Sequence, residues 1–355
     1  MHVAVYLPLL FPFLAALVAR PVGERLPPRR ATWLLTAGAL VLATASTAAL
    51  GMLAVTGLIR FPLLARLPHH HWSALAAQHH DPAPFSTALL AGTLAAAVTV
   101  LAGRMLWRRA RTLAQAATDA ACLPGRDQLV VLDDPTAEAY AIPGRPGRIV
   151  ISTGMLAALD PAEHQILLAH ERAHLTHRHH LFVACAQLAA AANPLLRPLA
   201  HTVGYTVERW ADETAGAAVG DRARVARAIG KAALATRRTA DAPGRRPAAA
   251  LGIMGRLRPA PLPGPVPRRV TALLAPAPRR HTWSALALGA LAVAAALCAL
   301  EAGLDLDALL DFVKRAAPAA APTDPPLPPN ANSRHGHRSS GPTPPAAARR
   351  RPRSG

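Results

Sequence analysis

The chain has 355 residues, of which 52% are hydrophobic and only 17% are charged, and its mean hydropathy is +0.21. These values are high for one soluble domain and normal for a protein that combines several membrane spans with a soluble part. A formal net charge of +19 would suggest nucleic acid as a partner of a soluble protein, but many of the arginines flank apolar segments or lie in the C-terminal tail. We therefore expect the lipid bilayer as a partner and no direct binding of nucleic acid.

Three apolar segments predict membrane-spanning helices at about residues 3–19, 31–59 and 87–106, which form an N-terminal membrane domain. Arginine clusters follow the first and the third of these segments. By the positive-inside rule, the N-terminus lies outside and the chain after residue 106 lies in the cytoplasm. The outer loop between the second and third spans carries His69, His70, His71, His79 and His80. A solvated loop is favoured there over external capture of a metal.

The segment 107–281 has a different character and is predicted to form a cytoplasmic domain. Its first part contains short apolar strands at residues 128–132, 138–142 and 148–152. A turn-rich connection between the last two strands favours an antiparallel hairpin. An edge strand of such a sheet can hold an extended peptide by main-chain hydrogen bonds, although the sheet can equally serve only to pack a helix.

A His-Glu-x-x-His pattern runs from His170 to His174 in this domain. Upstream, Asp160, Pro161 and Glu163 read as an N-cap, a first-turn proline and a capping-box glutamate, so the pattern falls on a helix. Residues four apart share one face of a helix, so the two imidazoles can bind one metal ion. A carboxylate at Glu171 can then take a proton from a bound water, which is the zincin arrangement.

A second helix, from about Thr202 to Val219, carries Glu208 and Asp212 on one face and ends at Gly220. A zinc site needs a third ligand and a group that orients a ligand histidine, and two carboxylates of this kind can supply both. The competing interpretation is a solvated acidic helix surface. Weaker candidates for the third ligand are His177, His201 and Glu213.

Between these two helices, an apolar run over 181–192 is too short to span a membrane and predicts a core or interfacial helix that ends at Asn193-Pro194. After Asp221, which begins another helix, residues 243–267 read as a flexible loop, and a short helix follows it. A fourth span is predicted at 282–300. We expect the Pro-, Ala- and Arg-rich segment 301–355 to be a disordered tail outside the cell.

The motifs His170-Glu171-x-x-His174, Asn193-Pro194 and Glu208-x-x-Ala211-Asp212 resemble the M56 family of membrane metallopeptidases, typified by the beta-lactam sensor-transducers. The allied M48 family, which includes prenyl-protein and membrane quality-control peptidases, shares the zinc motifs. The three strands followed by Ser152-Thr153-Gly154-Met155-Leu156 also match this group, over roughly residues 1–300. The order of three spans, a zinc domain and a fourth span favours M56.

The resemblance implies one zinc ion per chain, with His170, His174 and Glu208 as ligands and Glu171 as the general base. It implies that Asp212 supports a ligand histidine. Two departures are visible. A short tail stands where the sensor-transducers carry an extracellular penicillin-binding domain, so we expect no direct beta-lactam sensing. Val266 stands before Pro267 where M48 peptidases often have a histidine, so no residue is assigned to stabilise an oxyanion.

The sequence thus predicts a multi-pass α-helical membrane protein of about four spans with a cytoplasmic α+β zincin-like (gluzincin) metallopeptidase domain, in the plasma membrane of a bacterium. The expected activity is zinc-dependent cleavage of a cytoplasmic or membrane-associated protein or peptide, with a transcriptional repressor as one candidate substrate. One alternative is an M48-like protease for quality control of membrane proteins. Another is a signalling protein that uses the zincin scaffold without proteolysis.

Overall fold

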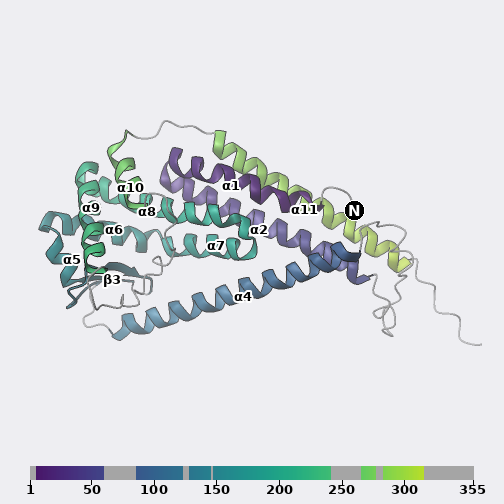
Figure 1. Cartoon of the computed structure of the whole chain (residues 1–355), viewed down its shortest axis with the longest axis horizontal. Helices are drawn as coiled ribbons and strands as arrows, with labels where there is room; N and C mark the ends of the chain where they lie inside the picture. Colours follow the sequence, from purple (N-terminus) through teal and green to yellow (C-terminus); the bar gives the residue numbers. More distant parts are fainter. Residues whose placement is uncertain are drawn as a thin grey trace, which may run out of the picture. The chain divides into compact units, whose positions relative to one another are not determined.

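The computed structural model of the chain describes residues 5–59, 85–122, 128–144, 147–240, 265–276 and 283–315. The histidine-rich loop, most of the predicted flexible loop and the basic C-terminal tail lie outside these ranges. The helices and strands, most of them labelled in Figure 1, are α1 (Leu7–Arg25), α2 (Pro28–Ile59), α4 (Phe85–Cys122), β1 (Leu129–Leu132), β2 (Ala139–Ile142), β3 (Arg148–Ser152), α5 (Thr153–Ala158), α6 (Pro161–Thr176), α7 (His179–Ala192), the 3-10 turn η3 (Pro194–Leu196), α8 (Arg197–Val219), α9 (Arg222–Ala240), α10 (Pro265–Leu274) and α11 (Trp283–Arg315).

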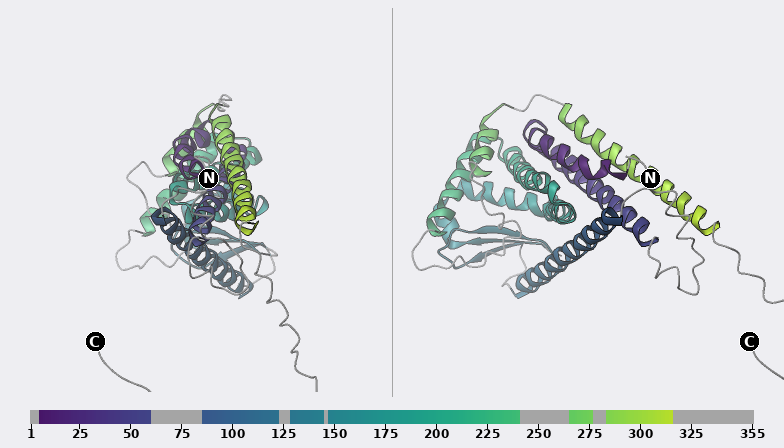
Figure 2. Two further views of the ribbon diagram at one scale, coloured as in Figure 1. Left: turned by 90° about the vertical axis from the view of Figure 1, so that its right-hand side faces the viewer. Right: turned by 45° about the vertical axis from the view of Figure 1, so that its right-hand side comes forward.

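Four of the described helices, α1, α2, α4 and α11, are long and apolar enough to cross a membrane. They correspond to the four predicted spans and indicate a membrane protein. Helix α2 contacts α1, α4 and α11; the ribbons of α1, α2 and α11 run alongside one another, whereas α4 diverges from α2 (Figures 1 and 2). Their sidedness stays a prediction, because the arginine clusters alone support it.

Two of these helices continue beyond the predicted spans. Helix α4 runs on to Cys122, past the predicted end of the span at 106. Helix α11 runs on to Arg315, so the expectation that the disordered tail begins at residue 301 is wrong. The reason is that Leu304, Leu306 and Phe312 continue the apolar pattern among the acidic residues, and Leu306 packs against a cluster that contains buried residues of α2 and α4.

Small side chains form the core of the helix bundle. Ala15, Ala19, Ala39, Ala186 and Ala295, from four different helices, are almost fully buried in one cluster. Small residues let helix backbones approach closely, which is how helices pack within membranes. The cluster includes residues of α7 and α8 as well as of the spans, so these two helices belong to the bundle core.

The sheet has the strand order β1-β3-β2. Strands β2 and β3 are antiparallel, which confirms the predicted hairpin, whereas β1 pairs with β3 in parallel. The central strand β3 buries Ile149 and Ile151 in one cluster and Val150 in another, so both of its faces are covered. Among the described strands, β2 pairs only with β3 and leaves its other edge open.

The local signals for the helices around the site are confirmed. Asp160 accepts from the backbone of Glu163, whose side chain accepts in return from the backbone of Asp160, so α6 begins with a full capping box. Gly220 ends α8 in the left-handed conformation, with φ 74°. Asp221 then caps α9 through the backbone N–H of Arg224. Helix α8 begins before Thr202, at Arg197, because Pro198 suits the first turn of a helix.

Candidate metal centre

Helices α6 and α8 pack against each other and bring three ligand atoms to one point. The Nε2 atoms of His170 and His174 lie 3.1 Å apart, and they lie 3.6 and 3.7 Å from the carboxylate oxygens of Glu208. Ligand atoms at zinc-binding distance from one tetrahedral ion are separated by roughly 3.3 Å. The observed spacing therefore fits zinc, and two imidazoles with one carboxylate leave the fourth position open for catalysis.

The other ring nitrogen of His170 faces Asp212, with Nδ1 3.1 Å from Oδ1. Asp212 is only 1% exposed, so the interpretation of this helix face as a solvated acidic surface is wrong. Burial alone would lower the pKa of His170, but the carboxylates of Asp212 and Glu208 raise it to about 10. The same face of α8 thus supplies one carboxylate to the ligand cluster and a second that orients a ligand ring.

His174 is backed by a residue that the sequence did not single out. Its Nδ1 lies 3.1 Å from Nδ1 of His179, whose side chain is fully buried. Burial, together with the neighbouring His174 and His177, lowers the pKa of His179 to about 3, so this ring is neutral and can accept a hydrogen bond. Since Nε2 of His174 faces the ligand cluster, its Nδ1 carries the proton and donates to His179.

The turn between α6 and α7 brings His179 back to His174. Arg178 adopts the left-handed conformation there, with φ 50°, and separates the end of α6 from the start of α7 at His179. His177 in the same turn stacks on Trp210 at 4.7 Å between ring centroids. The only sequence signal for His179 was its place in a run of histidines after the motif, which is too common to identify a role.

Glu171 lies beside the ligand cluster with a side chain that is almost fully buried. Burial raises the pKa of this carboxyl group from its ordinary 4.5 to about 7. A carboxyl group with such a pKa can both accept and return a proton near neutral pH. The position and acidity of Glu171 therefore agree with the role of a general base.

Arg269 of α10 completes the site and was not identified from the sequence. Its guanidinium donates to both oxygens of Asp212, at 2.6 and 2.8 Å, and its Nη1 lies 2.9 Å from Oε2 of Glu208. Burial would raise the pKa of both carboxyl groups, but Arg269 and the ligand histidines lower it. Both groups are therefore carboxylates, as a ligand and an orienting acceptor must be. No spacing rule connects Arg269 to residues of α8.

The weaker candidates for a third ligand lie elsewhere. His177 is engaged with Trp210, and Glu213 forms an ion pair with Arg222 at 2.7 Å. His201 is exposed, almost two turns before Glu208 on α8. Among the described residues, the one group of three or more metal-binding side chains is His170, His174 and Glu208.

A cavity of about 840 Å³ opens beside the ligand cluster. His170, Glu171, Glu208 and Arg269 lie in its wall, and Tyr140 belongs to the stretch of β2 that borders it. Most of the remaining wall is apolar and comes from α6, α9 and α10, including Ile166, Leu167, Val225, Ala228, Ile229, Ala232, Val266 and Val270. A few polar residues, which also include Glu138, Thr236 and Arg237, thus stand in a mainly apolar wall, as in many ligand sites.

Residues 104–275 match the model of peptidase family M48. No curated protein and no solved structure matches the chain. The match does not bear out the finer assignment to M56, but M48 peptidases are typically zinc-dependent, in agreement with the histidine and glutamate cluster. The matched segment contains every residue described above, from Tyr140 to Arg269, and this similarity to the M48 metallopeptidases supports a metalloprotease.

Proposed function

We propose that the protein is a membrane-integrated zinc endopeptidase. The observation that carries this proposal is the meeting of His170, His174 and Glu208 around one point, with Glu171 buried beside them at an apolar cavity. A zinc ion held by these three side chains would acidify a water molecule and polarise a peptide carbonyl group. The site therefore combines a Lewis acid with a general base whose pKa is close to 7.

The side chains around the metal ligands have two roles, proton transfer and the positioning of the ligands. Glu171 removes the proton from the attacking water and delivers it to the nitrogen of the leaving amine. Asp212 and His179 hold the two ligand rings in fixed orientations and tautomers, because each faces the ring nitrogen that is turned away from the ligand cluster. Arg269 fixes Asp212 and Glu208 in turn. Such support keeps the ligands in place when substrate enters.

The open edge of β2 supports an extended peptide as the substrate. Ala139 and Tyr140 of β2, with Ala137 and Glu138 just before the strand, line the cavity that contains Glu171. An extended chain that pairs with the edge strand would carry its scissile carbonyl past the site and place every second side chain in the cavity. Because the cavity wall is mainly apolar, an aliphatic or aromatic side chain beside the cleaved bond fits best.

Two candidate biological roles follow for this activity. By the positive-inside rule, the site faces the cytoplasm, where a transcriptional repressor is a candidate substrate through the resemblance to M56. The match to the M48 model favours the second role, cleavage of damaged or misassembled membrane proteins. Many unrelated membrane substrates would support quality control, whereas one regulator would support signalling.

The decisive test compares the wild type with Glu171→Gln in purified protein and in cells. We expect the variant to keep one zinc ion per chain and to lose cleavage by at least about a hundredfold, because it lacks the base. Glu213→Gln is a matched control, since Glu213 lies on α8 but pairs with Arg222 away from the cavity. Quantitative proteomics of the two strains would identify the cleaved proteins. Unchanged proteolysis in Glu171→Gln would refute the mechanism, and an unchanged cellular phenotype in it would favour a scaffold that signals without proteolysis.

A further inference from the structure

Helices α7 and α8 pack against membrane-spanning helices as well as against the peptidase domain. Helix α7 contacts α2 and α4, and α8 contacts α1 and α2. Val183 and Ala189 of α7 and Leu199 and Val203 of α8 are buried in the same cluster as the cores of α1, α2 and α11. In Figure 1 the α7–α8 pair lies along α2 and ends partway down it. This placement raises the question of how deep the pair lies in the bilayer.

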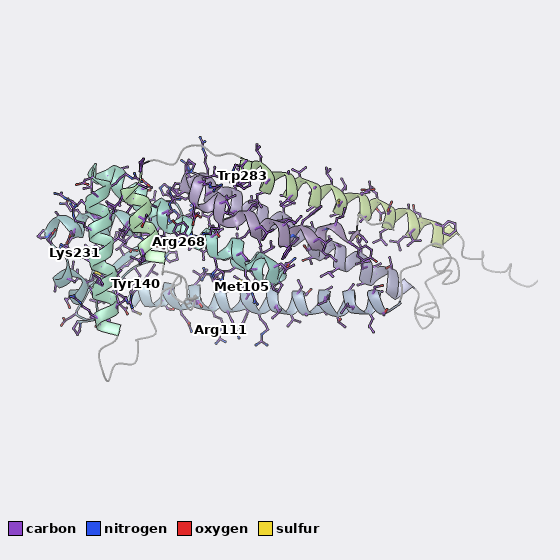
Figure 3. All side chains as sticks on the ribbon, turned by 45° about the horizontal axis from the view of Figure 1, so that its top comes forward. Met105, Arg111, Tyr140, Lys231, Arg268 and Trp283 are labelled. Atoms are coloured by element: carbon purple, nitrogen blue, oxygen red, sulfur yellow. The ribbon has the colours of Figure 1, made fainter. Side chains whose placement is uncertain are left out.

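Aromatic and basic side chains mark one boundary of the bilayer. Trp33, Trp107 and Trp283 stand near the ends of three spans and are 57%, 64% and 52% exposed. The guanidinium of Arg25 lies over Trp283, and that of Arg111 lies over Trp107, each at 5.7 Å. Figure 3 labels Trp283 at the start of α11 and Arg111 on α4. Exposed tryptophans beside arginines at the ends of apolar helices are typical of the membrane–water interface.

The helix pair meets this boundary at Phe182 and Trp210. The ring of Phe182 on α7 lies 4.8 Å from the ring of Trp33, edge to face. The guanidinium of Arg29, one turn before Trp33, lies 5.7 Å above the ring of Trp210 on α8. The chain therefore enters the bilayer near Phe182 and leaves it near Trp210. Since Trp210 stands between Glu208 and Asp212, the metal centre lies at the boundary itself.

The depth of the tip follows from helix geometry. Ala192 is ten residues beyond Phe182, which corresponds to roughly 15 Å of helix. Asn193 donates from Nδ2 to Oγ of Ser46 at 3.2 Å, and Ser46 stands about 20 Å along α2 from Trp33. The hydrocarbon core is about 30 Å thick. The pair therefore reaches the middle of the bilayer and cannot cross it.

The turn at the tip satisfies its polar groups within the protein, as a turn inside hydrocarbon must. The side chain of Asn193 accepts from the backbone N–H of Leu195 at 3.0 Å, and its backbone carbonyl accepts from Leu196 at 2.9 Å. Ser46 donates to the carbonyl of Leu42 at 2.7 Å. The tip presents Pro194, Leu195 and Arg197 outward, and Leu195 is 45% exposed. An arginine at this depth must extend its guanidinium along its aliphatic stem toward a headgroup region.

We infer that residues 179–207 form a re-entrant membrane hairpin, which enters the bilayer from the side of the metal centre and turns back at Asn193-Pro194. The partner of its exposed face is lipid. The hairpin anchors α6 and α8, the two helices that hold the metal ligands, at the membrane surface. This inference concerns topology and does not depend on the proposed peptidase activity.

Cysteine labelling of the full chain in membrane vesicles tests the inference. Cys122, Cys185 and Cys298 are replaced by serine, and single cysteines are introduced at Leu195, Leu94 and Leu274. All three leucines are exposed in the structure, at 45%, 46% and 62%. Leu94 lies in the span α4 and serves as the lipid control, whereas Leu274 at the end of α10 serves as the aqueous control.

With a membrane-impermeant maleimide applied to both faces of the vesicles, we expect Leu274→Cys to react and Leu94→Cys and Leu195→Cys to be protected at least tenfold. A nitroxide label at Leu195→Cys should be accessible to molecular oxygen and poorly accessible to a water-soluble nickel complex. The same pattern is expected for a label at Leu94→Cys. Labelling of Leu195→Cys as fast as Leu274→Cys would overturn the hairpin, since it would place the tip in water. All variants also carry Glu171→Gln, so the result is independent of proteolysis.

Discussion

The guanidinium of Arg269 binds the carboxylate of Asp212 with two nitrogens, at 2.6 and 2.8 Å, across 57 residues of sequence. A third nitrogen of the same group lies 2.9 Å from Glu208. One side chain of α10 therefore holds both the third ligand and the carboxylate behind His170. The neighbouring residue, Arg268, is turned the other way, toward Glu24 of the membrane helix α1 at 2.8 Å. Position 269 thus links α10 directly to the metal centre.

Arg269→Lys is predicted to weaken zinc binding by about 10- to 100-fold, because lysine keeps the charge and loses the planar fork that binds two carboxylates. Zinc retention against a graded series of chelators, measured on the purified protein, checks this. Arg268→Lys is the matched control and should behave as wild type. Equal zinc retention in the two variants would show that Arg269 does not support the ligands.

His179→Leu is predicted to lower zinc affinity by about 10- to 100-fold, because His174 then loses the acceptor that fixes its tautomer. His179→Asn should restore most of the affinity, since the amide oxygen can occupy the place of Nδ1 and accept the same hydrogen bond. The absorption spectrum of the cobalt-substituted protein, which reports ligand geometry, should change in the leucine variant and recover in the asparagine variant. A spectrum that is altered equally by both variants would indicate a packing role alone.

The metal-free protein should lose stability as pH rises from about 4.5 to 7 through Glu171. Burial raises the pKa of this group from 4.5 in the unfolded chain to about 7 in the fold. Its contribution to the free energy of unfolding is therefore fully present below pH 4.5 and is lost as pH rises to about 7, by on the order of 3 kcal/mol. Thermal unfolding in detergent should show this loss in the wild type and not in Glu171→Gln. Parallel pH profiles for the two proteins would contradict the assignment.

Ser46→Ala is predicted to destabilise the protein by about 1 kcal/mol, since it removes the acceptor of Asn193 in a buried position. Thr99→Ala is the matched control, because Thr99 bonds only within its own helix and is exposed. Thermal unfolding of both variants in the same detergent gives the comparison. Equal melting temperatures would mean that the contact between α2 and the tip of the α7–α8 pair contributes nothing to stability.

If the protein is a peptidase whose site is anchored at the bilayer surface, cleavage should depend on the distance of the substrate from the membrane. An unfolded casein segment tethered about 10 residues from a single span should be cut at least about tenfold faster than the same segment tethered about 60 residues away, because the short tether keeps it at the site. The tethered proteins are reconstituted with the wild type and followed by gel. Equal rates would show that cleavage does not depend on the distance of the substrate from the membrane. They would not contradict the peptidase activity itself.

Local sequence patterns determined the secondary structure around the site. The capping box at Asp160, the stop at Gly220 and the spacing of His170 and His174 depend on residues within one or two helical turns, and each appears in the structure as predicted. The spacing of Glu208 and Asp212 likewise predicted a shared face. The four apolar segments predicted the long helices, although α4 and α11 continue beyond the ends of the predicted spans, because charged residues do not by themselves end a helix.

The tertiary structure alone decided which distant side chains meet. The sequence by itself determined a metal-binding helix, a second helix with two carboxylates and a set of membrane helices. It could not show that Arg269 reaches Asp212, that a left-handed residue at Arg178 returns His179 to His174, or that Asn193 lies against Ser46. Periodicity and capping are set by neighbours along the chain, whereas these contacts depend on how whole helices pack, and many side chains share in that packing.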